Sequence, residues 1–166
     1  LKHSDDAERS WHLLHRDSGS IGICNWYLPP ASSLEKIDSI RQELHEISEQ
    51  CDTIIVVGDL NIHHKSWLQF SREDTAGGRH LQEICQGQGL KQIVNGPTRG
   101  PYLLDLVLCN AHDIHVNVGP KISDHKSLLV KVPDSVEIRK LTSKWKWQYN
   151  DADWDAIQME LSHISW

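Results

Sequence analysis

The chain has 166 residues, of which 39% are hydrophobic and 24% charged, and its formal net charge is −6. These values are typical of a globular domain with a hydrophobic core and exclude a disordered chain. No apolar run approaches the roughly 18 residues of a membrane span, and no signal peptide opens the sequence. We therefore expect no membrane partner and an intracellular location, in the nucleus or the cytoplasm. The acidic balance disfavours a nucleic-acid binder without excluding one.

The cysteines and tryptophans are distributed differently along the chain. The four cysteines are scattered, with no CxxC pair, which argues against a zinc site or a disulfide framework and favours a reducing compartment. Four of the seven tryptophans lie after the last predicted strand. We therefore expect a body of residues 1–135 and a tryptophan-rich tail of residues 136–166.

The first predicted strand follows a polar segment. Residues 1–16 are rich in histidine, and we assign no element to them. Residues 21–28 alternate loosely and stop at two prolines, which cannot continue a central strand. This pattern predicts a strand that ends near Tyr27.

A helix and a buried strand come next. Ser32 to Glu35 has the S-x-x-E pattern of a capping box, and apolar residues then recur every three or four positions as far as Cys51. The β-branched run Thr53 to Val57 predicts a fully buried strand. This order of strand, helix and strand is typical of an α/β fold.

The second half is predicted to contain short elements separated by turns. We expect a loop or short helix directly after the Gly58 turn and a helix over residues 79–86. A final helix begins at Asp153, whose side chain can cap it. Between these helices, four apolar runs predict strands over residues 90–94, 102–109, 114–118 and 127–132.

Two polar side chains follow the buried strand at alternate positions. If the extended conformation continues past Gly58, Asp59 and Asn61 point to the same side of the chain. A carboxylate and an amide converging there could hold a divalent cation and a phosphate oxygen. The alternative is that they only build the turn after a core strand.

A third carboxylate lies inside an apolar run. Asp105 occurs within Leu-Leu-Asp-Leu-Val-Leu, and an unpaired buried carboxylate is costly. His125, next to Asp124 in another loop, offers the imidazole with which it could pair as an acid or base beside a phosphate. Alternatively, Asp105 caps a turn, and Asp124 and His125 are ordinary loop residues.

Five motifs in this order resemble one family. The sequence is similar to the endonuclease/exonuclease/phosphatase (DNase I-like) family, and more narrowly to the endonuclease of non-LTR (LINE-type) retrotransposon polyproteins. No single motif is specific, but their order is. The motifs stand at Tyr27–Pro30, Gly58–Trp67, Gly89–Arg99, Leu104–Leu108 and Ser123–His125, and residues 145–154 resemble the segment that leads to the reverse transcriptase.

The resemblance implies a four-layer α/β sandwich and a set of catalytic groups. Asp59 matches the acid that positions or activates the attacking water, and Asp105 matches the acid that orients the catalytic histidine, His125. Asp124, with Asp59, matches the acids at the metal end of the site, where Mg²⁺ or Mn²⁺ is expected. No role is implied for the histidines that follow Asn61.

The resemblance also implies a DNA partner. Tyr27 and Asn61 match residues that contact the scissile phosphate, and Arg99 lies in a motif that would face the nucleic acid. The family reaction is metal-dependent hydrolysis of a DNA phosphodiester, which nicks one strand and leaves a 3′-hydroxyl for reverse transcription. The reverse transcriptase region of the same polyprotein is the second expected partner.

The chain departs from the family before Tyr27. Family members carry an Asn and a metal-binding Glu on earlier strands, and Glu8 does not match either. We expect the N-terminal strands of the sandwich to be missing, and the isolated chain to be inactive or nearly so. The alternative function is a non-catalytic nucleic-acid or protein-binding remnant that uses an exposed sheet edge and the basic, tryptophan-containing segment Lys140–Trp147.

Overall fold

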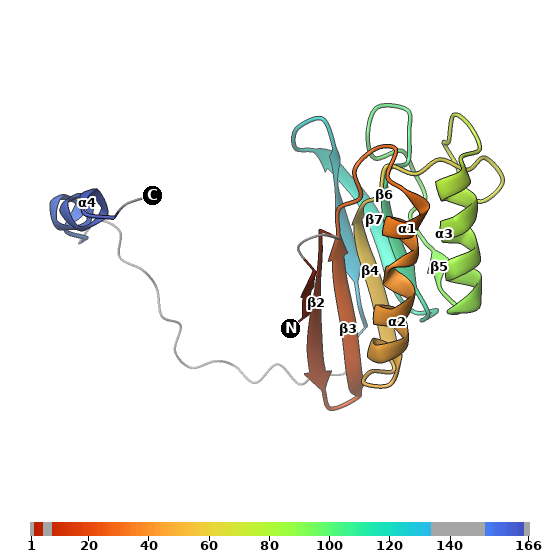
Figure 1. Cartoon of the computed structure of the whole chain (residues 1–166), viewed down its shortest axis with the longest axis horizontal. Coiled ribbons are helices and arrows are strands. Elements are labelled where there is room, and N and C mark those ends of the chain that lie inside the picture. The colour runs from red at the N-terminus through yellow and green to blue at the C-terminus, as the bar shows by residue number, and fades with distance from the viewer. Residues whose placement is uncertain (1, 5–7, 134–151, 165–166) are drawn as a thin grey trace. The chain divides into compact units, whose positions relative to one another are not determined.

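The computed structural model describes residues 2–4, 8–133 and 152–164, and the chain divides into two compact units, Leu1–Val136 and Glu137–Trp166. The first unit is an α/β sandwich. Figure 1 shows helices α1, α2 and α3 along one side of a large sheet. The sheet has six strands, and a second sheet has two, whose apolar side chains pack against the same core. These layers agree with the predicted class of fold.

The six-stranded sheet has the order β1-β2-β3-β4-β6-β5. Only β3 and β4 are parallel, because the helices between them carry the chain back to the starting edge. The strands are β1 (Lys2–Ser4), β2 (Arg9–Arg16), β3 (Gly19–Trp26), β4 (Thr53–Asp59), β5 (Lys91–Gln92) and β6 (Asp105–Cys109).

Strands β1 and β2 lie where we assigned no element. In β2, Trp11 is buried, but the apolar Leu14 is 48% exposed. The alternation of apolar and polar residues that marks a strand is therefore blurred in the sequence. A buried ion pair attaches β2 to the helices, because Arg9 Nη2 lies 2.9 Å from Glu43 Oε1.

The predicted single helix is two helices, α1 (Leu34–Asp38) and α2 (Ile40–Ser48), which break at Ser39. The predicted capping box was wrong by one residue. Ser33 caps α1 by accepting a hydrogen bond from the Lys36 N–H, whereas the Ser32 hydroxyl donates to the Pro29 carbonyl. The third helix, α3 (Ala76–Gly87), begins before the predicted position because Thr75 caps it.

Side-chain alternation in β4 and β6 decides which groups face the second sheet. The register pairs Asp59 with Asp105 and Val57 with Val107. These side chains share one face, and the intervening Gly58 belongs to the other face, toward the helices. Two carboxylates from remote parts of the sequence therefore lie directly opposite each other.

The second sheet is a hairpin of β7 (His115–Lys121) and β8 (Lys126–Lys131). Its turn carries Asp124 and His125 to the C-terminal end of β4. The hairpin contributes Val116 and Val130 to the core, while Leu129 on β8 is 56% exposed.

The second unit contains one described helix, α4 (Trp154–Ser162). The predicted helix cap is confirmed, since Asp153 Oδ1 accepts a hydrogen bond from the Ala156 N–H at 2.9 Å. None of the residues of α4 is buried. The segment Lys140–Trp147 lies outside the described residues. Among the described helices, none has the length and apolarity needed to cross a bilayer.

Candidate active site

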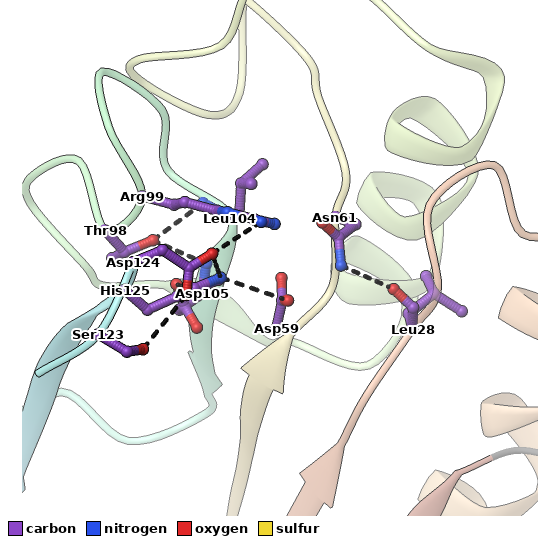
Figure 2. A network of polar contacts seen from close by, with 10 residues as sticks. All are labelled: Leu28, Asp59, Asn61, Thr98, Arg99, Leu104, Asp105, Ser123, Asp124 and His125. Atoms are coloured by element: carbon purple, nitrogen blue, oxygen red, sulfur yellow. Dashed lines mark hydrogen bonds and ion pairs between the residues drawn. The ribbon is translucent and has the colours of Figure 1, made fainter.

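The centre of the site is a pair formed by Asp105 and His125. Asp105 begins β6, and its Oδ2 lies 2.8 Å from His125 Nδ1. An ionised carboxylate can only accept, so the imidazole proton is on Nδ1. The other ring nitrogen, Nε2, faces the Oδ2 atoms of Asp59 and Asp124, each 3.9 Å away (Figure 2). The Asp–His pair expected from the sequence is thus present.

Asp59 is more deeply buried than the solvent-exposed Asp124, although both lie near Nε2 of the imidazole. Burial, followed by the negative charge of Asp105, raises the pKa of Asp59 above its usual range. Asn61 and His125 partly oppose this shift. The Oδ1 atom of Asp59 is buried and has no hydrogen-bond partner, so it remains available to a cation or a water molecule.

Asn61 does not continue the strand. Its φ is 47°, in the left-handed region that asparagine tolerates better than most residues. The expectation of an extended chain through Asn61 was therefore wrong. Its amide Nδ2 donates to the Leu28 carbonyl at 3.1 Å, which connects the ends of β3 and β4 beside Asp59 (Figure 2). The same amide lies beside the Asp59 carboxylate, whose pKa it lowers by hydrogen bonding, and its carbonyl oxygen remains for a ligand.

Asp124 is held by Arg99 across the mouth of the site. Arg99 Nη2 lies 2.8 Å from Asp124 Oδ2. Hydrogen bonding from its own backbone N–H and from the Ser123 hydroxyl, together with the charge of Arg99, keeps the pKa of Asp124 below its usual range. Asp124 is therefore ionised at neutral pH, and its charge is balanced by Arg99.

Thr98 is a site residue that the sequence reading missed. It is fully buried, and its hydroxyl oxygen accepts the backbone N–H groups of Leu104 and Asp105 at 3.1 and 3.0 Å. Its carbonyl accepts the Lys126 N–H at 2.8 Å. Thr98 thereby fixes the backbones on both sides of the Asp105–His125 pair. A threonine inside a turn-rich segment is the only sequence signal for this role.

Tyr27 is the predicted site residue least connected to the others. Its side chain is 44% exposed, and its backbone N–H donates to the Glu8 carbonyl at 3.0 Å. Within the described parts of the chain, no hydrogen bond links its hydroxyl to Asp59, Asn61 or His125. Its role as a phosphate contact stays a prediction.

A cavity of about 640 Å³ opens next to Asn61. Arg72 and Arg99 contribute to its walls, and His63 packs edge-to-face on Tyr102 with ring centroids 5.4 Å apart. Burial lowers the pKa of His63, so its imidazole is neutral at physiological pH. A volume of this size accommodates a nucleotide unit.

The next histidine has a local structural role. His64 is buried, its backbone N–H donates to the Ser71 hydroxyl at 3.1 Å, and its Nδ1 lies 3.1 Å from Ser66 Oγ. These contacts close the loop between β4 and α3. His63 therefore forms part of the cavity wall, and His64 holds the loop that follows it.

The site contains donor atoms suited to a divalent cation. Ligand atoms of Asp59, Asp105 and His125 lie within 4.8 Å of one another. Asp59 Oδ1 supplies a buried oxygen acceptor that no protein group satisfies. Carboxylate oxygens are the ligands that Mg²⁺ and Mn²⁺ prefer, so these residues fit such an ion. Asp124, the second predicted ligand, lies outside this cluster and is bound by Arg99.

Comparisons with known proteins concern the family and the fold of the chain. A family model described as "Endonuclease-reverse transcriptase" matches residues 21–129. The fold is similar to the endonuclease domain of TRAS1, a telomere-specific non-LTR retrotransposon, with a TM-score of 0.60 and 21% identity over 78% of this chain and 65% of that chain. It is also similar to a beta toxin from Staphylococcus aureus, with a TM-score of 0.55 and 10% identity over 75% of this chain and 57% of that chain.

The chain thus spans about two-thirds of the length of the solved endonuclease domain. No curated protein matched it. At these identities the solved structures show the fold alone, whereas the family model covers more than half of the chain. The chain therefore belongs to the endonuclease–reverse transcriptase family, and its fold is that of the DNase I-like endonucleases.

Proposed function

We propose that this chain provides the catalytic groups of a metal-dependent DNA endonuclease that hydrolyses one phosphodiester bond and leaves a 3′-hydroxyl. The observation that carries the proposal is the imidazole of His125, which Asp105 fixes through Nδ1 so that Nε2 faces Asp59 and Asp124. Such an arrangement suits proton transfer at a phosphate.

The two acids that flank His125 are suited to different tasks. Asp59 has a raised pKa and an unpartnered Oδ1, properties of a group that takes a proton from an attacking water. His125 Nε2 hydrogen-bonds a phosphate oxygen when the ring is protonated. Asp105 stabilises that protonated ring and holds its orientation.

Asn61 and Arg99 position the substrate in this proposal. The amide of Asn61 hydrogen-bonds the phosphate, and the guanidinium N–H groups of Arg99 that do not contact Asp124 donate to the DNA backbone. Asp59, together with Asp124 or Asp105, would hold a Mg²⁺ or Mn²⁺ ion. The ion would neutralise negative charge on the phosphate. In the intact polyprotein, the reverse transcriptase region would use the released 3′-hydroxyl as a primer.

The protein ligands of such an ion are few. Mg²⁺ prefers about six oxygen ligands in near-octahedral geometry. The cluster among the described residues contains two carboxylates and one imidazole. We therefore expect slow nicking by this chain, with much of the metal coordination left to water and the phosphate.

A supercoiled-plasmid assay with Mg²⁺ or Mn²⁺ tests the proposal. We expect slow conversion to the nicked form, reduced about 100-fold or more by Asp59→Asn or His125→Ala because each removes a group needed for proton transfer. His80→Ala is the matched control. His80 Nε2 lies 2.9 Å from Asp38 Oδ1, in a similar Asp–His pair remote from the site, and its loss should not affect nicking.

Nicking that is equal in the wild type, Asp59→Asn and His125→Ala would show that these residues do not catalyse the reaction. The alternative function, a binding remnant, depended on an exposed sheet edge and on the segment Lys140–Trp147, and that segment lies outside the described residues. No contact among the described residues favours it over the endonuclease.

A further inference from the structure

The turn that joins β7 to β8, residues 121–126, has a surface that the proposed chemistry does not use. Ile122 is 80% exposed, more than any other large apolar side chain of the described residues. Lys121 and Lys126 face each other in the hairpin register on either side of the turn. This combination of an apolar tip between two lysines needs an explanation.

Ile122 is held in a defined position despite its exposure. Its backbone N–H donates to the His125 carbonyl at 3.0 Å, which closes the turn on the candidate catalytic residue. On the other side, the Thr98 carbonyl accepts the Lys126 N–H. The turn is therefore attached to the same backbone that fixes the Asp105–His125 pair, and the exposed side chain moves with the site.

The charge of this turn is locally positive in an acidic protein. Like charges opposite each other in a hairpin are unfavourable, and neither Lys121 nor Lys126 forms an ion pair with any described residue. Arg99 already neutralises Asp124, the only acid of the turn. Two lysines that form no ion pair with a described residue, beside an acid already paired with Arg99, favour binding of an anionic partner.

We propose that the β7–β8 turn binds duplex DNA beside the scissile bond, with Ile122 packed on the sugars and base edges of the adjacent groove and Lys121 and Lys126 on the flanking phosphates. This inference depends on the proposed function, because a DNA strand whose phosphate contacts His125 must pass the residue anchored to the His125 carbonyl. Apolar side chains flanked by basic residues are a common means of binding the minor groove. The turn thus contributes to the affinity and placement of the nick.

A DNA-binding measurement tests the inference. The 166-residue chain is titrated into a fluorescein-labelled 30-base-pair duplex, and fluorescence anisotropy is measured with Ca²⁺ in place of Mg²⁺. We expect Ile122→Ala to weaken binding about tenfold without changing its salt dependence, because it removes apolar contact only. The double variant Lys121→Ala/Lys126→Ala should reduce the slope of log affinity against log salt by about 1.8, the value for two phosphate contacts.

Two variants of the same hairpin serve as controls. Leu129→Ala removes another exposed apolar side chain, and Lys131→Ala removes another lysine, both away from the turn. Neither should change the affinity as much as the turn variants do.

The outcomes separate the two proposals. DNA binding by the wild type that the turn variants leave unchanged would overturn this inference alone. A wild type without salt-dependent DNA binding would overturn the proposed function as well. If Ile122→Ala instead abolishes self-association of the chain and leaves DNA binding intact, the turn contacts protein and the inference is wrong.

Discussion

At the scale of single residues, the position of Asp59 favours cation binding but destabilises the fold when no cation is bound. Its carboxylate lies opposite Asp105 in the β4–β6 register, and both are close to the imidazole of His125. The arrangement concentrates negative charge where a cation and a phosphate would bind. The same concentration is unfavourable to the fold when no cation is present.

Replacing Asp59 with asparagine should therefore stabilise the metal-free protein at neutral pH. The folded-state pKa of Asp59 is raised, so its favourable contribution exists at low pH and is lost as the pH rises through that pKa. Thermal unfolding in EDTA should show a higher melting temperature for Asp59→Asn at pH 7.5. The difference should disappear below about pH 4, where the carboxyl is protonated in both the folded and the unfolded state.

The exposed Asp113 provides the control for this comparison. Asp113→Asn should leave the melting temperature unchanged at both pH values. Added Mg²⁺ should raise the melting temperature of the wild type more than that of Asp59→Asn. A lower melting temperature for Asp59→Asn at pH 7.5 would contradict the assigned cause of the pKa shift.

The residue types of the site were readable from the sequence, but their contacts were only partly so. An acid inside an apolar run predicted a partner for Asp105, and His125 is that partner. The direction of the Asn61 side chain was not predictable. The backbone turns into the left-handed region at this residue, and the only sequence signal for that turn is the asparagine itself. Thr98 was missed because its two backbone donors are six and seven residues away, beyond any local turn pattern.

At the scale of elements, the close approach of β3 to β4 places Asp59 beside the Leu28 backbone. A Cβ added to Gly58 would lie 1.7 Å from the Trp26 carbonyl oxygen. The Leu28 N–H donates to the Asp59 carbonyl at 2.9 Å, directly after this contact. Glycine is needed at position 58 because any side chain would separate the two strands.

Gly58→Ala should destabilise the fold by about 3 kcal/mol or more, since the clash is with backbone that cannot move without breaking the sheet. Urea unfolding followed by circular dichroism would measure the loss. Gly87→Ala is the matched control, because nothing lies within 4 Å of a Cβ at that helix position. That variant should be neutral or stabilising by about 0.5–1 kcal/mol. Equal stability of both variants would refute the steric argument.

The elements show where sequence patterns are reliable. Period-two and period-3.6 signals located β3, β4, β6, α3 and α4, with errors at their ends. The break at Ser39 was not predictable, because the apolar spacing continues across it. Instead, the Ser39 hydroxyl accepts a hydrogen bond from Arg9 on β2, a contact across 30 residues.

At the scale of the whole molecule, the chain divides at Val136, and the buried apolar core that the described residues form lies within the first unit. We therefore propose that residues 1–136 fold independently, and the predicted division into a body and a tryptophan-rich tail stays a prediction. Helix α4, none of whose residues is buried, belongs to the second unit.

Removal of residues 137–166 should leave the melting temperature of the first unit within about 2 °C of the full chain, because the first unit has its own buried core. It should also leave the rate of plasmid nicking unchanged. Scanning calorimetry of both proteins would measure the first quantity. A decrease of more than about 5 °C would show that the C-terminal unit stabilises the body and that the division is wrong.

The sequence by itself determined the class of fold and the family of the chain, because both depend on local patterns in a fixed order: a buried strand before Asp59, an acid within an apolar run, and Ser-Asp-His near the last strand. Tertiary structure alone decided how these groups meet. Strand register set Asp59 against Asp105, and the β7–β8 turn brought His125 between them with Ile122 at its tip. These contacts join residues 20 to 66 positions apart in the sequence, so no local pattern encodes them.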